Sequence, residues 1–94
     1  MPAYVIDLVD VHDRKGYEEY IAKAPATVAA YGGKYLARAP SPEVLEGAPP
    51  GRGVILEFPT LEQGRQWHAS AEYRETGGIR RRCARSTLLA VPGT

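Results

Sequence analysis

The hydrophobic pattern along the chain separates into segments of strand period and segments of helix period. Residues 3–11 alternate and are rich in β-branched types, which predicts a strand. Both of its faces are apolar, with Val5, Val9 and Val11 on one and Tyr4, Ile6 and Leu8 on the other. Because a strand that is apolar on both sides must be covered on both sides, we expect a layer of protein against each face.

The next periodic segment predicts an amphipathic helix that begins after Asp13, whose carboxylate can cap it. Its apolar positions recur every three or four residues, at Tyr17, Tyr20, Ile21, Ala24, Val28 and Tyr31. Pro25 lacks an N–H and clashes with the preceding turn, so we expect a kink or a short break there. Gly32 and Gly33 end the helix, since glycine adopts the left-handed conformation without steric cost.

Further strands are predicted over residues 34–39, 53–58 and 87–91. Between the first two of these strands lie a brief extended piece at 43–46 and a Gly- and Pro-rich stretch at 47–51. Such a composition is typical of a turn and packs poorly in a core. The two strands are therefore expected to form a hairpin with this connection as its loop.

Residues 60–69 predict a second helix. Thr60 and Gln63 match the capping box, in which each side chain accepts from or reaches the other's exposed backbone N–H. The helix is expected to bury Leu61 and Trp67 and to end near residue 69. Ser70 can then cap a further short helix.

The elements follow the order β-α-β-β-α-β, which is that of a ferredoxin-like α+β protomer with an antiparallel four-stranded sheet. Both helical crossovers cover the same face of such a sheet, so its apolar second face needs another cover. An identical sheet related by two-fold symmetry supplies a complementary surface. The pattern therefore predicts a homodimer whose sheets pack face to face.

A length of 94 residues provides for one hydrophobic core, so residues 1–94 are expected to form one domain. Twelve Lys and Arg against eleven Asp and Glu leave a net charge of +1, which gives no overall attraction to nucleic acid or to an anionic membrane. No window has the length and apolarity of a membrane span, and the start of the chain lacks a secretory pattern. We expect a soluble cytoplasmic protein.

Four stretches of the chain carry a family resemblance: PAYVIDLVDVHD, YEEYIAKAPATVAAYGGKYLAR, VILEFPTLEQGRQW and SAEYRETGGIRRR. Together they closely resemble the family called domain of unknown function 1330. The resemblance implies the dimeric α/β-barrel superfamily, whose ferredoxin-like protomers pair through their sheets. That superfamily includes cofactor-free monooxygenases, lactone isomerases and polyketide cyclases, so it implies no single reaction. The segment ARAPSPEVLEGAPPGRG departs from the family, where relatives have a more glycine-rich connection.

Arg38, Glu57 and His68 are the candidate catalytic residues. Arg38 and Glu57 lie on neighbouring predicted strands, where Arg38 would hold a substrate carboxylate or enolate and a desolvated Glu57 would act as general base. The alternative is a salt bridge that closes the end of the sheet. His68 can titrate near neutral pH, or it is simply exposed to solvent. No second histidine lies at ligand spacing, so we expect neither a metal site nor a cofactor.

The candidate substrate-binding residues are aromatic: Tyr17, Tyr35, Trp67 and Tyr73. A pocket lined in this way suits a planar organic acid or an aromatic ligand. The alternative is that the aromatic rings form an ordinary helix–sheet core, which is our interpretation of Tyr20 and Tyr31 because of their helical spacing.

Arginines cluster near the end of the second helical region, at Arg80, Arg81, Arg82 and Arg85. Cations are favoured at helix C-termini, so this cluster predicts a solvated helix end, and it lacks the stacking residues of a nucleic-acid site. Cys83, which has no second cysteine to pair with, is predicted to be partly buried packing.

The main functional hypothesis is a cofactor-independent enzyme of the isomerase, cyclase or lyase type that acts on an organic-acid or aromatic metabolite. It depends on a polar pair among aromatic residues and on the absence of serine-hydrolase and phosphate-loop motifs. The alternatives are a non-catalytic module that binds a small ligand and a purely structural dimer with a filled core.

Overall fold

The computed structural model describes residues 1–48 and 51–94, and its elements follow the predicted order. The strands are β1 (Ala3–Val11), β2 (Lys34–Ala39), β3 (Arg52–Phe58) and β4 (Ala84–Pro92). The helices are α1 (Arg14–Ala30), α2 (Leu61–Ala69) and α3 (Ala71–Cys83). The short helix expected after Ser70 is thus a full helix of 13 residues, and Pro49 and Pro50 of the predicted loop lie outside the described residues.

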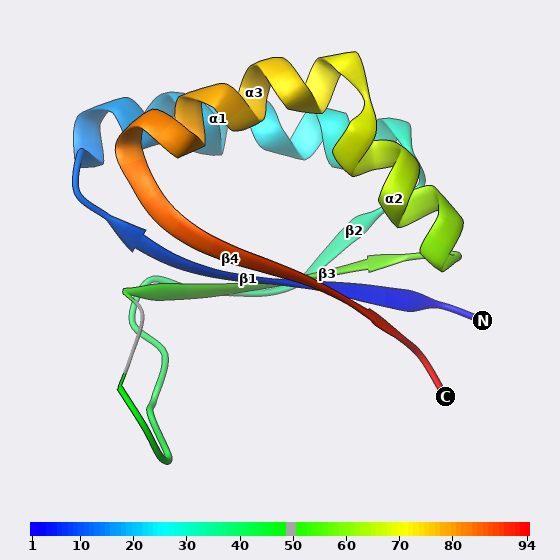
Figure 1. Cartoon of the computed structure of the whole chain (residues 1–94), viewed down its shortest axis with the longest axis horizontal. Helices are drawn as coiled ribbons and strands as arrows, with labels where there is room; N and C mark the ends of the chain where they lie inside the picture. The colour runs from blue at the N-terminus through cyan, green and yellow to red at the C-terminus, as the bar shows by residue number, and fades with distance from the viewer. Residues whose placement is uncertain (49–50) are drawn as a thin grey trace.

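The strands form one sheet in the order β2-β3-β1-β4, and each neighbouring pair is antiparallel. This is the ferredoxin-like arrangement, so the predicted fold class is confirmed. Helix α1 joins β1 to β2, and α2 with α3 joins β3 to β4. Figure 1 shows all three helices on one side of the sheet and the connection after β2 on the other.

The helices begin where the sequence predicts, because side-chain oxygens accept from the first free backbone N–H groups. These bonds run from Gly16 to Asp13 (3.1 Å), from Gln63 to Thr60 (3.1 Å) and from Tyr73 to Ser70 (3.2 Å). The reciprocal half of the capping box is replaced, since Gln63 Nε2 donates to the Tyr31 carbonyl (3.3 Å). At the other end of α1, Gly32 has a φ of 78°, the left-handed conformation expected there.

Three local expectations require correction. Helix α1 continues through Pro25 without a break, because Ala24 and Val28 on either side of it are buried in the core and tertiary packing sets the helix. The piece at 43–46 forms no strand, and Leu45 within it is 86% exposed. Strand β4 starts at Ala84, earlier than expected, because it pairs with β1 along its whole length.

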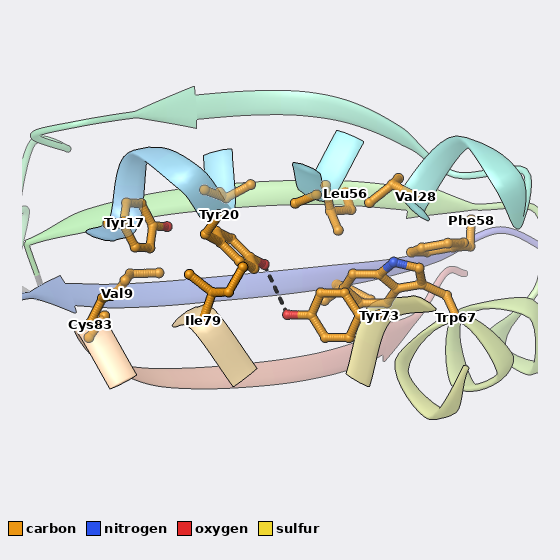
Figure 2. Close-up of a cluster of buried hydrophobic side chains, with 14 residues drawn as sticks. Val9, Tyr17, Tyr20, Val28, Leu56, Phe58, Trp67, Tyr73, Ile79 and Cys83 are labelled. Atoms are coloured by element: carbon orange, nitrogen blue, oxygen red, sulfur yellow. Dashed lines mark hydrogen bonds between the residues drawn. The ribbon is translucent and has the colours of Figure 1, made fainter. Parts of the chain in front are cut away.

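The core lies between the helices and the sheet, and Trp67 packs in it beside Phe58 and Tyr73 (Figure 2). Trp67 is 2% exposed, and its ring lies 5.3 Å from that of Phe58 and 4.1 Å from that of Tyr73. Its Nε1 donates to Thr27 Oγ1 at 3.1 Å, so the indole N–H is satisfied inside the core. Trp67 of α2 therefore links α1 and α3 to β3.

The opposite face of the sheet is apolar and is not covered by the helices (Figure 1). Ile6 of β1 lies between Ile55 of β3 and Leu89 of β4 on this open face. Ile55 and Leu89 are 38% and 48% exposed. A groove of about 880 Å³ lies between this open face and the segment 42–48. The two-sided apolarity predicted for β1 is thus present, with one side left open.

Among the described residues, we find no helix with the length and apolarity needed to cross a membrane.

Candidate functional site

The candidate site is built around Asp7, a buried acid on the helix-facing side of β1 that is 5% exposed. In the sheet register, Asp7 lies opposite Val54 of β3 and Leu88 of β4. Its diagonal neighbours, two residues away on those strands, are Arg52 and Ser86. Diagonal positions are within reach of long side chains, so the register alone brings an acid, a guanidinium and a hydroxyl together.

The carboxyl of Asp7 is held in an unusual electrostatic state. Burial raises its pKa to about 6, and the charges of Arg80 and Arg52 oppose this shift only in part. Its Oδ1 has no hydrogen-bond partner among the described residues, and the same holds for Arg52 Nε and Ser86 Oγ. Buried polar atoms usually have partners, so three such atoms around one carboxyl indicate a place where a ligand or water binds.

Two tyrosines and an arginine form a hydrogen-bonded chain above Asp7. The hydroxyls of Tyr20 and Tyr73 lie 2.9 Å apart (Figure 2), and Arg80 Nε donates to the Tyr73 hydroxyl at 3.3 Å. Burial, followed by the neighbouring Tyr73, raises the pKa of Tyr20, so the Tyr20 hydroxyl stays protonated. The bond between the two tyrosines uses one of their hydroxyl protons. The remaining hydroxyl proton has no acceptor among the described residues. It can be donated to a bound oxygen.

A cleft of about 470 Å³ opens between α1 and the paired ends of β1 and β3, and Arg52 is the member of the polar cluster that lines it. Its inner wall includes Tyr17 and Arg52, and the Arg52 guanidinium lies 5.4 Å from the centre of the Tyr17 ring. Burial and the charge of Asp7 raise the pKa of Tyr17 to about 12. Both wall residues therefore interact electrostatically with Asp7, although Asp7 itself does not line the cleft.

The predicted pairing of Arg38 with Glu57 is wrong. Glu57 lies opposite Lys34 and forms an ion pair with it on the open face (3.3 Å), whereas Arg38 lies opposite Val54 on the helix-facing side. The cause is an irregularity of β2 between Tyr35 and Ala37, which shifts the register by one residue. A shift of one residue turns every later side chain to the other face.

The other predicted site residues divide among three places. Tyr17 lines the cleft, and Tyr73 belongs to the hydrogen-bonded chain. Tyr35 is half-buried at the sheet edge, where the Arg38 guanidinium lies 4.6 Å from its ring centre. Trp67 and His68 line a separate hollow of about 220 Å³ beside β4.

His68 is exposed, as in the alternative interpretation of the sequence. Its position in α2 keeps it outside the Asp7 cluster. Burial of its ring, followed by the charge of Arg80, lowers its pKa. His68 is therefore mostly neutral near neutral pH.

The arginine cluster is not uniformly solvated, which corrects the prediction for Arg80. Arg81, Arg82 and Arg85 are exposed, but Arg80 is 6% exposed and bonds to Tyr73. Helical spacing explains this, because Tyr73, Thr76, Arg80 and Cys83 follow one face of α3. Cys83 is buried as predicted, with its Sγ 3.7 Å from Asp13 Oδ2.

Sequence reasoning missed Asp7, Arg52, Ser86 and the inward role of Arg80. A signal for Asp7 was present, because it shares the alternating face of Val5 and Val9 and is a charged residue within that face. Within the described part of the chain, no three His, Cys, Asp or Glu side chains gather as a metal site would require.

Comparison with known proteins agrees with the fold. Residues 2–94 match the family described as Domain of unknown function (DUF1330). A protein of unknown function from Rhodopseudomonas palustris is 18% identical, with a TM-score of 0.78 over 99% of this chain and 82% of that one. SnoaB from Streptomyces nogalater, described as a cofactor-independent oxygenase, is 14% identical, with a TM-score of 0.70 over 99% and 93%. A dimeric ferredoxin-like protein of unknown function from Jannaschia sp. CCS1 is 8% identical, with a TM-score of 0.69 over 99% and 100%.

No curated protein matches the chain in sequence.

Proposed function

Because the chain belongs to the DUF1330 family, whose description assigns no activity, we propose its function from its own site. The proposed function is a cofactor-independent enzyme of the isomerase, cyclase or lyase type that moves a proton on a small organic acid or aromatic metabolite. The observation that supports it is the buried Asp7 carboxyl, which has an unpartnered oxygen and a pKa of about 6. A general base works best when its pKa is near the working pH.

Each member of the cluster has a role in such a reaction. Asp7 Oδ1 accepts the proton from the substrate carbon and returns it at another atom. The negative charge that develops on the substrate oxygen is stabilised by the free tyrosine hydroxyl proton of the Tyr20–Tyr73 pair. Arg80 polarises Tyr73 through its Nε–H and so strengthens that donor. Tyr17 lines the cleft as a substrate-binding residue.

The fold supports chemistry without a cofactor in at least one similar structure. SnoaB is described as a cofactor-independent oxygenase, and its chain is 14% identical to this one. At that identity the similarity shows a shared fold and does not show a shared reaction. We place the activity in the cytoplasm, where the free thiol of Cys83 stays reduced.

Proton exchange tests this function without knowledge of the substrate. The purified protein is incubated in deuterated water with a panel of enolisable oxo acids that includes phenylpyruvate, and deuterium incorporation above the buffer rate is measured. Replacing Asp7 by Asn should lower the catalysed rate by about a hundredfold or more, as expected for loss of a general base. The matched control is Glu75→Gln, which removes an exposed carboxylate from α3 and should leave the rate unchanged. Equal exchange in the wild-type and Asp7→Asn proteins would contradict the proposal.

A non-catalytic module that binds a small ligand is the second candidate, because the same unpartnered polar atoms would also suit a ligand that does not react. The two functions differ in one measurement. A panel compound that raises the melting temperature but shows no Asp7-dependent exchange indicates binding alone.

The proposal includes a homodimer formed through the open face. Proteins from Jannaschia sp. CCS1 and Thermobifida fusca with this fold are described as dimeric. Here, the open face presents Ile55, Leu89 and Val91, which are 38%, 48% and 41% exposed. Apolar side chains gathered on one face are typical of an interface with another chain.

If the dimer forms through the open face, two isoleucines of similar exposure should differ in how substitution by aspartate affects dimerisation. Ile55→Asp places a charge on the open face and should convert the dimer to monomer in sedimentation velocity, because an unpaired charge is costly to bury. Ile21 on α1 is 39% exposed, close to the 38% of Ile55, and Ile21→Asp should remain dimeric. A wild-type monomer at micromolar concentration would refute the dimer.

A further inference from the structure

The cleft beside α1 has the size and surface of a small-molecule site. Its volume of about 470 Å³ falls in the range of ligand pockets. Its apolar lining comes from two elements and a loop, with Val9 of β1, Tyr17 and Ile21 of α1, and Pro40 after β2. A ring wall and aliphatic neighbours favour a ligand with a planar apolar body.

The charges of the cleft are arranged by depth. Arg14, Asp10 and Glu18 are exposed at its rim, whereas Arg52 is half-buried at its inner wall. The ion pairs found among the described residues do not include Arg52, and its Nε is buried without a partner there. The charge of Arg80 lowers the pKa of Asp7 more than the charge of Arg52 does, so Arg52 is not the main countercharge of Asp7.

A half-buried guanidinium that has no ion pair among the described residues recognises one chemical group best. Its N–H donors form a fork that matches the two oxygens of a carboxylate. The rim carries one arginine and two acids, which disfavour a second negative charge on the ligand. The deep end of the cleft therefore favours one carboxylate, with the apolar body of the ligand beside the Tyr17 ring.

We propose that this cleft binds a small monocarboxylate with a planar apolar body, in which Arg52 holds the carboxylate and Tyr17 packs against the body. This inference rests on the proposed function and names the substrate class of the same site. Arg52 is a diagonal neighbour of Asp7 in the sheet register, so a carboxylate held by Arg52 would lie near the strand position of the proton-accepting carboxyl.

The test compares cinnamate with cinnamamide, which share a planar body and differ in the carboxylate. Titration of the full-length protein is followed by amide NMR. For cinnamate, the shifts should concentrate at the amides of Tyr17, Gly51 and Arg52. Cinnamamide should bind at least about tenfold more weakly, since hydrogen bonds to a charged group are worth about 1.5–3 kcal/mol.

Substitutions test whether Arg52 provides the charge that binds the carboxylate of cinnamate. Arg52→Gln should weaken cinnamate binding about tenfold or more, and Arg52→Lys, which keeps the charge without the fork, should weaken it less. Arg65→Gln removes an exposed arginine of α2 outside the cleft and should change nothing. Equal affinity for cinnamate and cinnamamide, unchanged binding by Arg52→Gln, or shifts confined to the groove on the open face would each overturn the inference.

Binding and proton exchange separate this inference from the proposed function. Cinnamate that binds through Arg52 to a protein without Asp7-dependent exchange supports the cleft and contradicts the enzyme. Asp7-dependent exchange without cinnamate binding supports the enzyme and contradicts the cleft as assigned.

Discussion

Replacing Trp67 by alanine lowers the free energy of unfolding by about 3–5 kcal/mol, the range for removing a large aromatic side chain from a packed core. Trp67 is 2% exposed and packs against Phe58 and Tyr73, so its removal leaves a cavity that its neighbours cannot fill without moving. The substitution also removes the N–H that bonds to the buried Thr27 hydroxyl. Urea unfolding at fixed protein concentration measures the effect.

Two variants separate the contributions of Trp67. Trp67→Phe keeps a ring in the core and loses the bond to Thr27, so its cost should be smaller than that of Trp67→Ala. His68→Ala changes the exposed neighbour on the same helix and should stay within about 0.5 kcal/mol of wild type. A loss of less than about 1 kcal/mol in the free energy of unfolding for Trp67→Ala would contradict tight packing of the indole in the core.

The second large effect depends on pH. Because the pKa of Asp7 is about 6 in the folded chain, against an ordinary value of 3.8, the folded state binds this proton more tightly than the unfolded state. The associated stability is fully present below the ordinary pKa and is lost as the pH rises through 6. This difference in pKa corresponds to roughly 3 kcal/mol.

The Asp7→Asn variant isolates this contribution, since asparagine does not titrate and all other groups are shared. The difference in free energy of unfolding between variant and wild type should shift by about 2.5 kcal/mol toward the variant between about pH 4 and about pH 7.5. Both proteins are compared at one concentration, because a dimer's stability depends on it. Parallel pH curves would show that Asp7 has an ordinary pKa.

Much of the fold follows from local rules that act within a few residues. The bounds of β1 and β2 were predicted from alternation and flanking glycine or proline, and Asp13, Thr60 and Ser70 cap helices as expected. Pro25 departs from the rule because burial on both sides of it outweighs a lost helix bond. Local patterns fail where packing from distant segments decides.

The candidate site was predicted only in part, for two physical reasons. A register shift in β2 reversed the face of Arg38, and alternation alone does not reveal such a shift. Arg80 was interpreted from its charged neighbours, although its helical spacing places it with Tyr73 on the buried face. Tyr17 and Tyr73 were predicted to be substrate-binding residues, whereas Asp7, a buried acid on the helix-facing side of β1, lies in a strand that was considered only for its apolar residues.

The unpartnered acid in the middle of β1 makes this molecule less heat-resistant near neutral pH than its packing would allow. A laboratory selection for thermal tolerance alone, without selection for chemistry, would therefore favour an uncharged side chain at position 7. Variants that keep Asp7 under that pressure would be those in which a nearby change supplies its Oδ1 with a donor.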